Sequence, residues 1–247
     1  MEFFFIGLMA FGCEYIDSAF GMGYGTILSP VLIIMGYNPL VVIPSILLSQ
    51  ALSGFTAAMF HHKQKNVIFT AESKDTKVVI VIAVTGIAAC IVAAIIAINI
   101  PSWVLKLYIG VLVLAMGGIL LSRMRFKFSW KKMIGVGIIS SFNKGMSGGG
   151  FGPVVTAGQI ISGHEHKNAV GCTTMAEAPI CLTAFATYCV FKGFPDWRLV
   201  LALLIGAILS TPFGAFTTRH IPEKYVRPLL GSLISVLGVW TLFKALT

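Results

Sequence analysis

About eight long apolar segments occupy almost the whole chain and restrict what it can fold into. A helix that crosses a bilayer needs about 20 predominantly apolar residues, and these segments approach or exceed that length. Only 11% of the residues are charged, against about 25% in soluble domains. We therefore expect an all-α polytopic membrane protein. The segments are 3–36, 41–60, 78–99, 103–121, 133–163, 169–191, 199–217 and 225–246.

Positive charge gathers in two connections between these segments, 61–77 and 122–132. The net charge is +9. Loops rich in Lys and Arg stay on the cytoplasmic side, and two helices separate the two connections, so both are placed in the cytoplasm. The location predicted is the cytoplasmic membrane of a prokaryote. The basic residues are Lys63, Lys65, Lys74, Lys77, Arg123, Arg125, Lys127, Lys131 and Lys132.

The two halves of the chain resemble each other. FGMGYGTILS at 20–29 aligns without a gap on SGGGFGPVVT at 147–156, an offset of 127, the separation of Phe20 and Ser147. Later, IPSWVLKLYIG at 100–110 aligns on IPEKYVRPLLG at 221–231. Internal repeats are typical of transporters, whose binding site lies between the repeats near the bilayer midplane.

These alignments predict one integral membrane domain made of two repeats, 1–122 and 123–247. Each repeat has one Gly-broken segment followed by three helices. If each break interrupts a single crossing, the halves are parallel and both termini are cytoplasmic. If each break turns a re-entrant hairpin, the halves are inverted and the termini are external. We favour inversion because it brings both breaks to the midplane from opposite faces.

Each glycine cluster breaks an apolar segment at membrane depth. Backbone groups there need partners unless they face protein or water, so a cluster indicates a cavity or tight packing. A short helix is expected after each break, at 26–36 and 153–163, and its N-terminal N–H groups and dipole favour an anion. The competing interpretation is close helix packing through small residues. The candidate anion-binding glycines are Gly21, Gly23, Gly25, Gly148, Gly150 and Gly152.

Ionisable and polar residues precede both breaks. Such side chains are rare inside membranes and are usually functional. The alignment pairs Asp17 with Lys144, so these two residues either pair with each other or each serve their own half. A purely structural ion pair is the alternative. The polar residues before the breaks are Glu14, Asp17, Ser18, Asn143 and Lys144, and Asn143 and Lys144 are candidate substrate ligands.

A second polar group lies on the segments that follow the breaks. Ser45 and Ser49 are four residues apart, as are Thr173 and Glu177, so each pair shares a helix face. Glu177 lies deep in the bilayer, where a carboxylate is costly; it either carries a coupling proton or is a protonated or paired structural residue. Gln50, its counterpart, is interpreted as an orienting hydrogen bonder. Candidate substrate ligands are Ser49, Gln50, Thr173 and Thr174, and candidate proton carriers are Asp17, Glu177 and Glu14.

The glycine turns resemble those of the sulfite exporter TauE/SafE family of small anion permeases. The resemblance covers essentially the full chain and is clearest at GMGYGTILSP (21–30) and GGGFGPVVTAG (148–158). The second turn is close to the family's usual pattern of glycines followed by a proline. The first departs from it, with Met22 and Tyr24 among the glycines and Pro30 further on. The resemblance implies a secondary transporter of sulfite, sulfonates or related sulfur or carboxylate anions, with the six glycines lining the site.

Other functions are weighed against this one. The stretch GMSG at 145–148 matches the serine turn of rhomboid-type intramembrane proteases, but the later histidines fall near segment ends. A non-transporting membrane assembly protein would need a partner surface, and no extramembrane domain is expected. An enzyme is not expected, nor is ATP hydrolysis, because GxxxxGK[ST] is absent. The expected partners are a small anionic substrate and the bilayer, not nucleic acid, and homo-oligomers are compatible with this interpretation.

No metal or other cofactor is expected. The five cysteines form no CxxC motif and are interpreted as small core residues. The HEH stretch at 164–166 offers too few ligands to argue a metal site. The histidines are expected at the surface, in loops or at a helix end; they are His61, His62, His164, His166 and His220.

Overall fold

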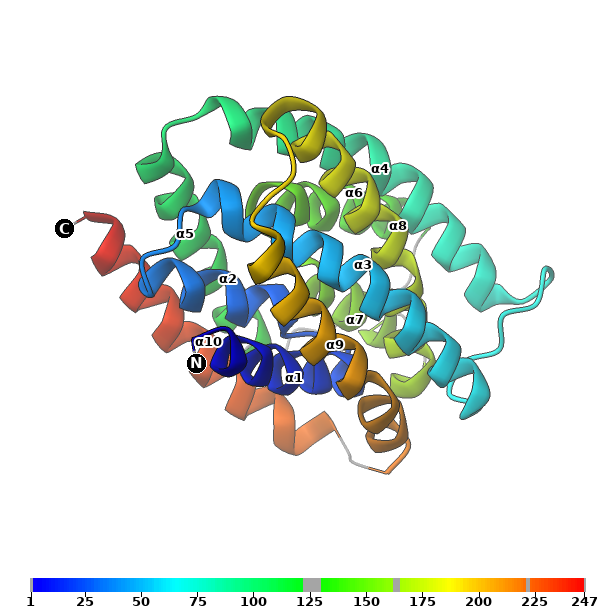
Figure 1. Ribbon diagram of the computed structural model, residues 1–247. Coiled ribbons are helices and arrows are strands. Elements are labelled where there is room, and N and C mark those ends of the chain that lie inside the picture. Colours follow the sequence, from blue (N-terminus) through cyan, green and yellow to red (C-terminus); the bar gives the residue numbers. More distant parts are fainter. Residues whose placement is uncertain (1, 122–129, 162–164, 221–222, 247) are drawn as a thin grey trace.

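The computed structural model describes residues 2–121, 130–161, 165–220 and 223–246 (Figure 1). These residues form ten α-helices with no strand among them, as predicted for an all-α membrane protein. Each Gly-broken segment forms two helices and each of the other segments forms one. The helices are α1 (Glu2–Phe20), α2 (Tyr24–Ile34), α3 (Pro39–Lys63), α4 (Lys74–Asn99), α5 (Ser102–Leu121), α6 (Trp130–Ser147), α7 (Phe151–Ile161), α8 (His166–Lys192), α9 (Trp197–Thr218) and α10 (Glu223–Leu246).

Six helices in the described part of the chain are long and apolar enough to cross a membrane, namely α1, α3, α4, α5, α8 and α9. The segments expected at 133–163 and 225–246 form α6–α7 and α10. Helices α2 and α7 have 11 residues each. At 1.5 Å per residue such a helix covers about 16 Å, roughly half of a hydrocarbon core. Neither α2 nor α7 can therefore cross a bilayer alone.

The helix boundaries and helix pairings follow the repeat seen in the sequence. Helix α7 begins and ends at the residues that correspond to the ends of α2 at the offset of 127. Helix α1 packs on α9, and its counterpart α6 packs on α4; α3 packs on α8, and α5 packs on α10. A twofold relation between two five-helix halves produces this set of pairs. The proposed boundary between the repeats, 122/123, lies outside the described residues.

The chain reverses direction at the first break. The Tyr37 hydroxyl, just after α2, donates to Oε1 of Glu2 at the start of α1 (2.7 Å), so α2 returns to the face from which α1 begins. Lys244, near the C-terminus, donates to the carbonyl of Ile34 at the end of α2 (3.2 Å). Both termini therefore lie on one face, at the left of Figure 1, with the α3–α4 connection at the right.

The second break opens toward the opposite face. Asn168, near the start of α8, donates to Oδ2 of Asp75 at the start of α4 (2.8 Å). The α7 end and the α8 start therefore lie beside the α3–α4 connection, away from the termini. Because the two short helices return to opposite faces, each break is a hairpin turn and the halves are inverted. The parallel alternative does not fit this geometry.

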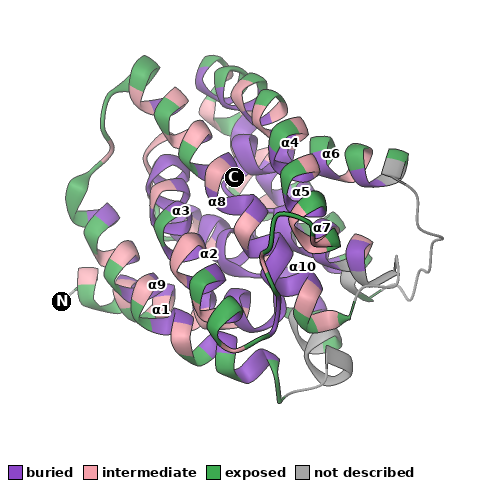
Figure 2. Cartoon of the chain, turned by 90° about the vertical axis from the view of Figure 1, so that its right-hand side faces the viewer, coloured by how far each residue is buried: buried purple, intermediate pink, exposed green. Residues whose placement is uncertain are grey.

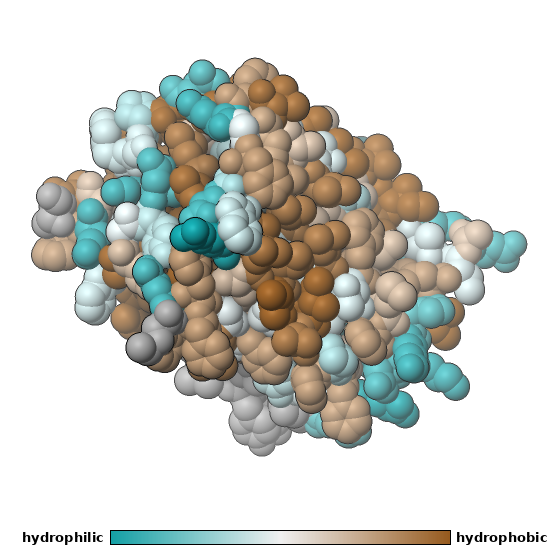
Figure 3. All heavy atoms as spheres, viewed as in Figure 1, coloured by the Kyte–Doolittle hydropathy of each residue, from teal (hydrophilic) through white to brown (hydrophobic). Residues whose placement is uncertain are grey.

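Apolar side chains cover much of the outside of the molecule, as bilayer contact requires. Large apolar residues of α4, α9 and α10 are well exposed, including Val84 (65%), Phe213 (58%) and Phe243 (68%). Apolar residues spread over the middle of the face in Figure 3, with hydrophilic ones toward its ends. Figure 2 shows buried residues turned inward, around α2, α3 and α8. The interior thus surrounds the two breaks.

Candidate functional site

The two glycine breaks touch each other inside the molecule. A Cβ atom added to Gly25 would overlap the carbonyl oxygen of Gly148, and one added to Gly152 would overlap that of Gly21. Gly25 corresponds to Gly152 in the repeat alignment, and Gly21 corresponds to Gly148. The two contacts are therefore equivalent. Backbones approach this closely only where neither residue carries a side chain.

The turn geometry also requires glycine at Gly21 and Gly148, where φ is +69° and +73°. Residues with a side chain rarely adopt this region. Gly23 and Gly150 directly precede α2 and α7, which begin two residues before the positions predicted from sequence. The packing role of the glycines is thus visible in the structure. Their role in lining an anion site stays a prediction.

Two threonine hydroxyls join the breaks across the halves. The N–H of Gly150 donates to Oγ1 of Thr26 (3.1 Å), and the Thr156 hydroxyl donates to the carbonyl of Gly21 (2.8 Å). Backbone groups of each turn thus find partners in the opposite half, as a membrane interior demands. Sequence reasoning missed both threonines, although both lie inside the glycine motifs.

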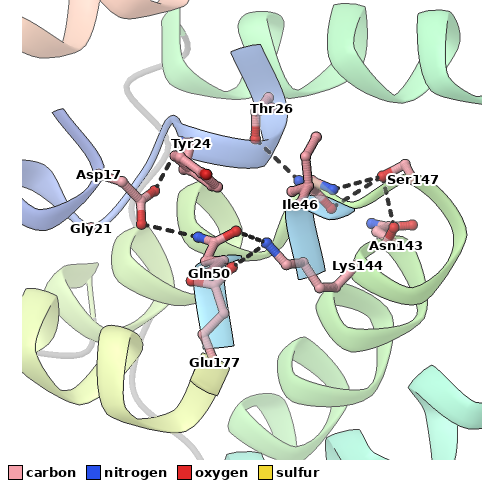
Figure 4. Close-up of polar contacts among 12 residues, drawn as sticks. Asp17, Gly21, Tyr24, Thr26, Ile46, Gln50, Asn143, Lys144, Ser147 and Glu177 are labelled. Atoms are coloured by element: carbon pink, nitrogen blue, oxygen red, sulfur yellow. Dashed lines mark hydrogen bonds and ion pairs between the residues drawn. The ribbon is translucent and has the colours of Figure 1, made fainter. Parts of the chain in front are cut away.

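A chain of four polar side chains from α1, α3, α6 and α8 lies beside the breaks (Figure 4). Lys144 forms an ion pair with Glu177 (Nζ to Oε1, 2.7 Å) and also donates to Oε1 of Gln50. The Gln50 Nε2 donates in turn to Oδ2 of Asp17 (3.2 Å). All four residues are at most 4% exposed. We call these four residues the central cluster.

The central cluster decides between the pairings that the sequence left open. Asp17 contacts Gln50 and Lys144 contacts Glu177, so each residue has a partner from its own half. These two pairs are equivalent in the repeat alignment. The bond from Lys144 to Gln50 then joins the halves. The Gln50 amide has its oxygen toward the ammonium group, which can only donate, and its nitrogen toward the carboxylate. The orienting role of Gln50 toward a substrate stays a prediction.

Asp17 also lies at the N-terminus of α2. Its Oδ1 accepts the N–H of Tyr24, the first residue of that helix (3.2 Å). N–H groups in the first turn lack intrahelical partners and favour negative charge. A carboxylate of the protein thus occupies the anion position of α2. In the second half the corresponding residues are Lys144 and Phe151, so a cation replaces the carboxylate.

Three predicted ligands bond to side chains of neighbouring helices. Ser49 bonds the hydroxyl of Tyr24 (2.7 Å), and Asn143 accepts the hydroxyl of Tyr108 (2.6 Å). The Thr173 hydroxyl lies within hydrogen-bond distance of the Thr156 hydroxyl (3.0 Å) and accepts Nε2 of Gln159 (2.9 Å). The partners Tyr24, Tyr108, Thr156 and Gln159 were not predicted. Nothing in the local sequence distinguishes these four residues, so their hydrogen bonds to the predicted ligands are seen only in the packed structure.

The remaining predicted residues are less directly connected. Thr174 and Ser45 donate to carbonyls of their own helices, at Val170 and Val41. Ser18 donates to the carbonyl of Thr211 on α9 (3.3 Å). Glu14 is 1% exposed, and its Oε2 has no hydrogen-bond partner among the described residues.

His61 corrects the expectation that the histidines lie at the surface. It is fully buried in the last turn of α3, where Nε2 donates to the carbonyl of Ser18 (2.8 Å) and Nδ1 accepts from Asn66 (3.1 Å). Its repeat counterpart, Tyr188, donates to the carbonyl of Gly145 (2.9 Å). Both side chains therefore hold the last turn before a break, a relation visible in the sequence only through the alignment.

The serine of the protease-like stretch has backbone partners. The Ser147 hydroxyl donates to the carbonyl of Asn143 (2.8 Å) and accepts the N–H of Gly149 (3.1 Å). These bonds end α6 and start the turn. A nucleophilic serine needs a base within hydrogen-bond reach. The described contacts of Ser147 are thus those of a residue that stabilises the turn.

Comparison with known proteins places this architecture in a family. The family model described as sulfite exporter TauE/SafE matches residues 5–241. The chain is 27% identical over 256 residues to the "probable membrane transporter protein YtnM" of Bacillus subtilis (strain 168), covering 98% of this chain and 82% of that protein. The search of solved structures gives no significant match. With its apolar helices and near-complete family match, the chain is an integral membrane transporter that belongs to the sulfite exporter TauE/SafE family.

Proposed function

We propose that the chain is a secondary transporter of small anions and binds them at Lys144, beside the start of α7. The substrate class is sulfite, an organosulfonate, or a related sulfur-containing or carboxylate anion. The family match supports this class, because its model is described as a sulfite exporter. Lys144 supports an anion independently, because it is a cation only 1% exposed and lies between the two breaks.

The proposal depends mainly on one difference between the halves: the equivalent residues Asp17 and Lys144 have opposite charges. The N-terminus of α2 already has a carboxylate on its first N–H. Helix α7 starts at the corresponding residue, Phe151, but Lys144 occupies the place of the carboxylate. A substrate anion there would receive both the lysine and the helix N-terminus, which together favour negative charge. In this proposal Thr173 and Asn143 add hydrogen bonds.

The proposal also places the molecule in its membrane. The basic connection 61–77 lies on the face opposite the termini, and we assign that face to the cytoplasm of a prokaryotic cell. Repeats 1–122 and 123–247 would rock about the central cluster to expose it to either face in turn. A proton is the proposed coupling ion, with Asp17, Glu177 and Glu14 as its candidate carriers.

Flux into liposomes tests the proposal with a panel of sulfite, sulfate, methanesulfonate and acetate. We expect the wild-type chain to move at least one of these anions and Lys144→Gln to lose that flux. Lys167→Gln is the matched control, because Lys167 is a half-exposed lysine at the start of α8 that pairs with Glu165 (3.0 Å). No flux of any anion would refute anion transport. Wild-type flux from Lys144→Gln would refute the site.

A further inference from the structure

We infer that Glu177 is a tethered substitute for the substrate: its carboxylate holds the anion's place on Lys144, and the substrate binds only when Glu177 leaves that place with a proton. The inference rests on the proposed function and specifies how the same site couples anion to proton. One proton then accompanies each anion that displaces the carboxylate. Glu177, rather than Asp17 or Glu14, carries it.

The charge balance of the central cluster is the first reason. The Lys144 ammonium group lies 2.7 Å from Oε1 of Glu177. The Gln50 amide links Lys144 to Asp17, since it contacts both side chains. Glu14 on α1 is a third carboxyl group within electrostatic range of Lys144 and Glu177. The other titratable groups nearby are thiols and a phenol, on α1, α4, α8 and α2: Cys13, Cys90, Cys181 and Tyr24.

One cation therefore serves several acidic groups in a buried space. An incoming anion would add negative charge where desolvation is already costly and uncompensated charges are not tolerated. Taking up one proton at the moment of binding keeps the total charge of the site unchanged. Burial of the central cluster thus favours anion and proton entering together.

The contacts of the two carboxylates show which one takes the proton. Both oxygens of Asp17 accept N–H groups, one from the backbone of Tyr24 and one from Gln50. Neither donor can become an acceptor, so a proton on Asp17 would remove the negative charge that strengthens both bonds and would add an O–H that these two groups cannot accept. Glu177 instead contacts Lys144, the group that the substrate needs. Once protonated, Glu177 releases the lysine and gains an O–H that can donate to the anion.

Gln50 provides Lys144 with a hydrogen-bond acceptor throughout the replacement of Glu177 by the substrate. It corresponds to Glu177 in the repeat alignment but has an amide, which does not titrate. Its oxygen stays on Lys144 while Glu177 withdraws. The ammonium group therefore has an acceptor before, during and after the exchange, and a buried cation is never left alone.

Proton uptake during anion binding tests the inference directly. Purified protein in a weakly buffered solution is titrated with methanesulfonate, a monovalent anion that keeps its charge over the working pH range. We expect the wild type to take up about one proton per bound anion, and the affinity to weaken up to about tenfold per pH unit as pH rises, following the linkage of one proton. Glu177→Gln is expected to bind with no proton uptake and with an affinity independent of pH.

Two further variants complete the design. Glu165→Gln makes the same chemical change at an exposed site on the same face as the α3–α4 connection, and wild-type uptake is expected. Glu177→Asp retains the carboxyl group and should retain uptake, which gives a readout if Glu177→Gln fails to fold. Anion binding by the wild type without proton uptake overturns the inference but leaves the proposed function. Uptake that persists in Glu177→Gln overturns the role of Glu177. Absence of binding by any anion, at any pH, overturns both.

Discussion

The two breaks share one backbone plan and differ in the side chains placed on it. Both turn at a glycine with φ near +70°, and both start an 11-residue helix at the same offset. In the first half, Asp17 accepts the N–H of Tyr24 at the start of α2. In the second half, Lys144 takes the corresponding place and pairs with an acid. Glycine thus sets the shape of each break, while one residue sets its charge.

A second pair of equivalent positions also differs between the halves, here in polarity. Tyr24 and Ser49 share a buried hydrogen bond of 2.7 Å in the first half. Their counterparts are Phe151 and Ala176, both fully buried, which offer only apolar contact. At these two positions the first half therefore has a buried polar contact where the second half has an apolar one. The four predictions below test this comparison, from the largest expected effect to the smallest.

The contact between the breaks predicts that Gly25→Ala severely destabilises the protein. Its Cβ would overlap the carbonyl of Gly148, and backbone on both sides leaves no flexible group to move. We expect a loss of about 3 kcal/mol or more, seen as a lower thermal midpoint and a lower folded yield in detergent. Gly12→Ala is the control, since a Cβ there meets nothing within 4 Å. Equal midpoints for both variants would contradict the contact.

Removing the buried cation should have the next largest effect. Lys144→Gln leaves the Glu177 carboxylate buried without its ion pair, which costs about 3–5 kcal/mol. The double variant Lys144→Gln/Glu177→Gln removes both charges, so we expect most of the stability to return while anion binding stays lost. Thermal unfolding and anion titration on the same samples separate these effects. A double variant no more stable than the single one would refute the pairing.

Replacing the buried polar pair Tyr24 and Ser49 by the apolar pair of the second half should change stability less than the two substitutions above. Ser49→Ala leaves the Tyr24 hydroxyl buried without this partner, and we expect a loss of about 1–3 kcal/mol. The double variant Tyr24→Phe/Ser49→Ala reproduces the apolar pair of the other half and should be more stable than Ser49→Ala alone. A double-mutant cycle on thermal unfolding measures the coupling. Additive losses would show that the two side chains act independently.

The helix ends give the smallest expected change. Lys65, two residues after the end of α3, lies in the left-handed region (φ 57°), and Gly193, directly after the end of α8, also has a positive φ (79°). Giving α3 a glycine there, Lys65→Gly, should raise stability by about 0.5–1 kcal/mol because it relieves this strain. Lys63→Gly, inside the last turn of α3, should lower stability by a similar amount. Opposite shifts of the thermal midpoint are the expected readout.

The sequence predicted the features that depend on local pattern. Glycine clusters located both breaks, and the starts of the short helices were placed within two residues. The internal alignment anticipated that Lys144 and Glu177 correspond to Asp17 and Gln50. The favoured inversion of the halves agrees with the positions of the α2 and α7 ends.

The sequence did not predict which side chains meet across long separations. The Gln50–Lys144 bond joins residues on different helices, and its formation depends on how each helix is rotated about its axis. His61 was expected at the surface because it falls in the connection 61–77 between two apolar segments. In the structure, Asn66 folds back to donate to both His61 and the carbonyl of Ala215, so the chain buries the imidazole. Such contacts depend on how the helices pack, and no pattern in the neighbouring sequence predicts them.

The acid at one break and the base at the other have a consequence for how such a protein can be assembled. A homodimer of single-repeat subunits would place the same residue at both sites, aspartate facing aspartate or lysine facing lysine. Only two different subunits, or two copies fused in one polypeptide, can assign Asp17 to one site and Lys144 to the other. Fusion into one chain is therefore what allows a nearly symmetric backbone to hold an electrically unsymmetric centre.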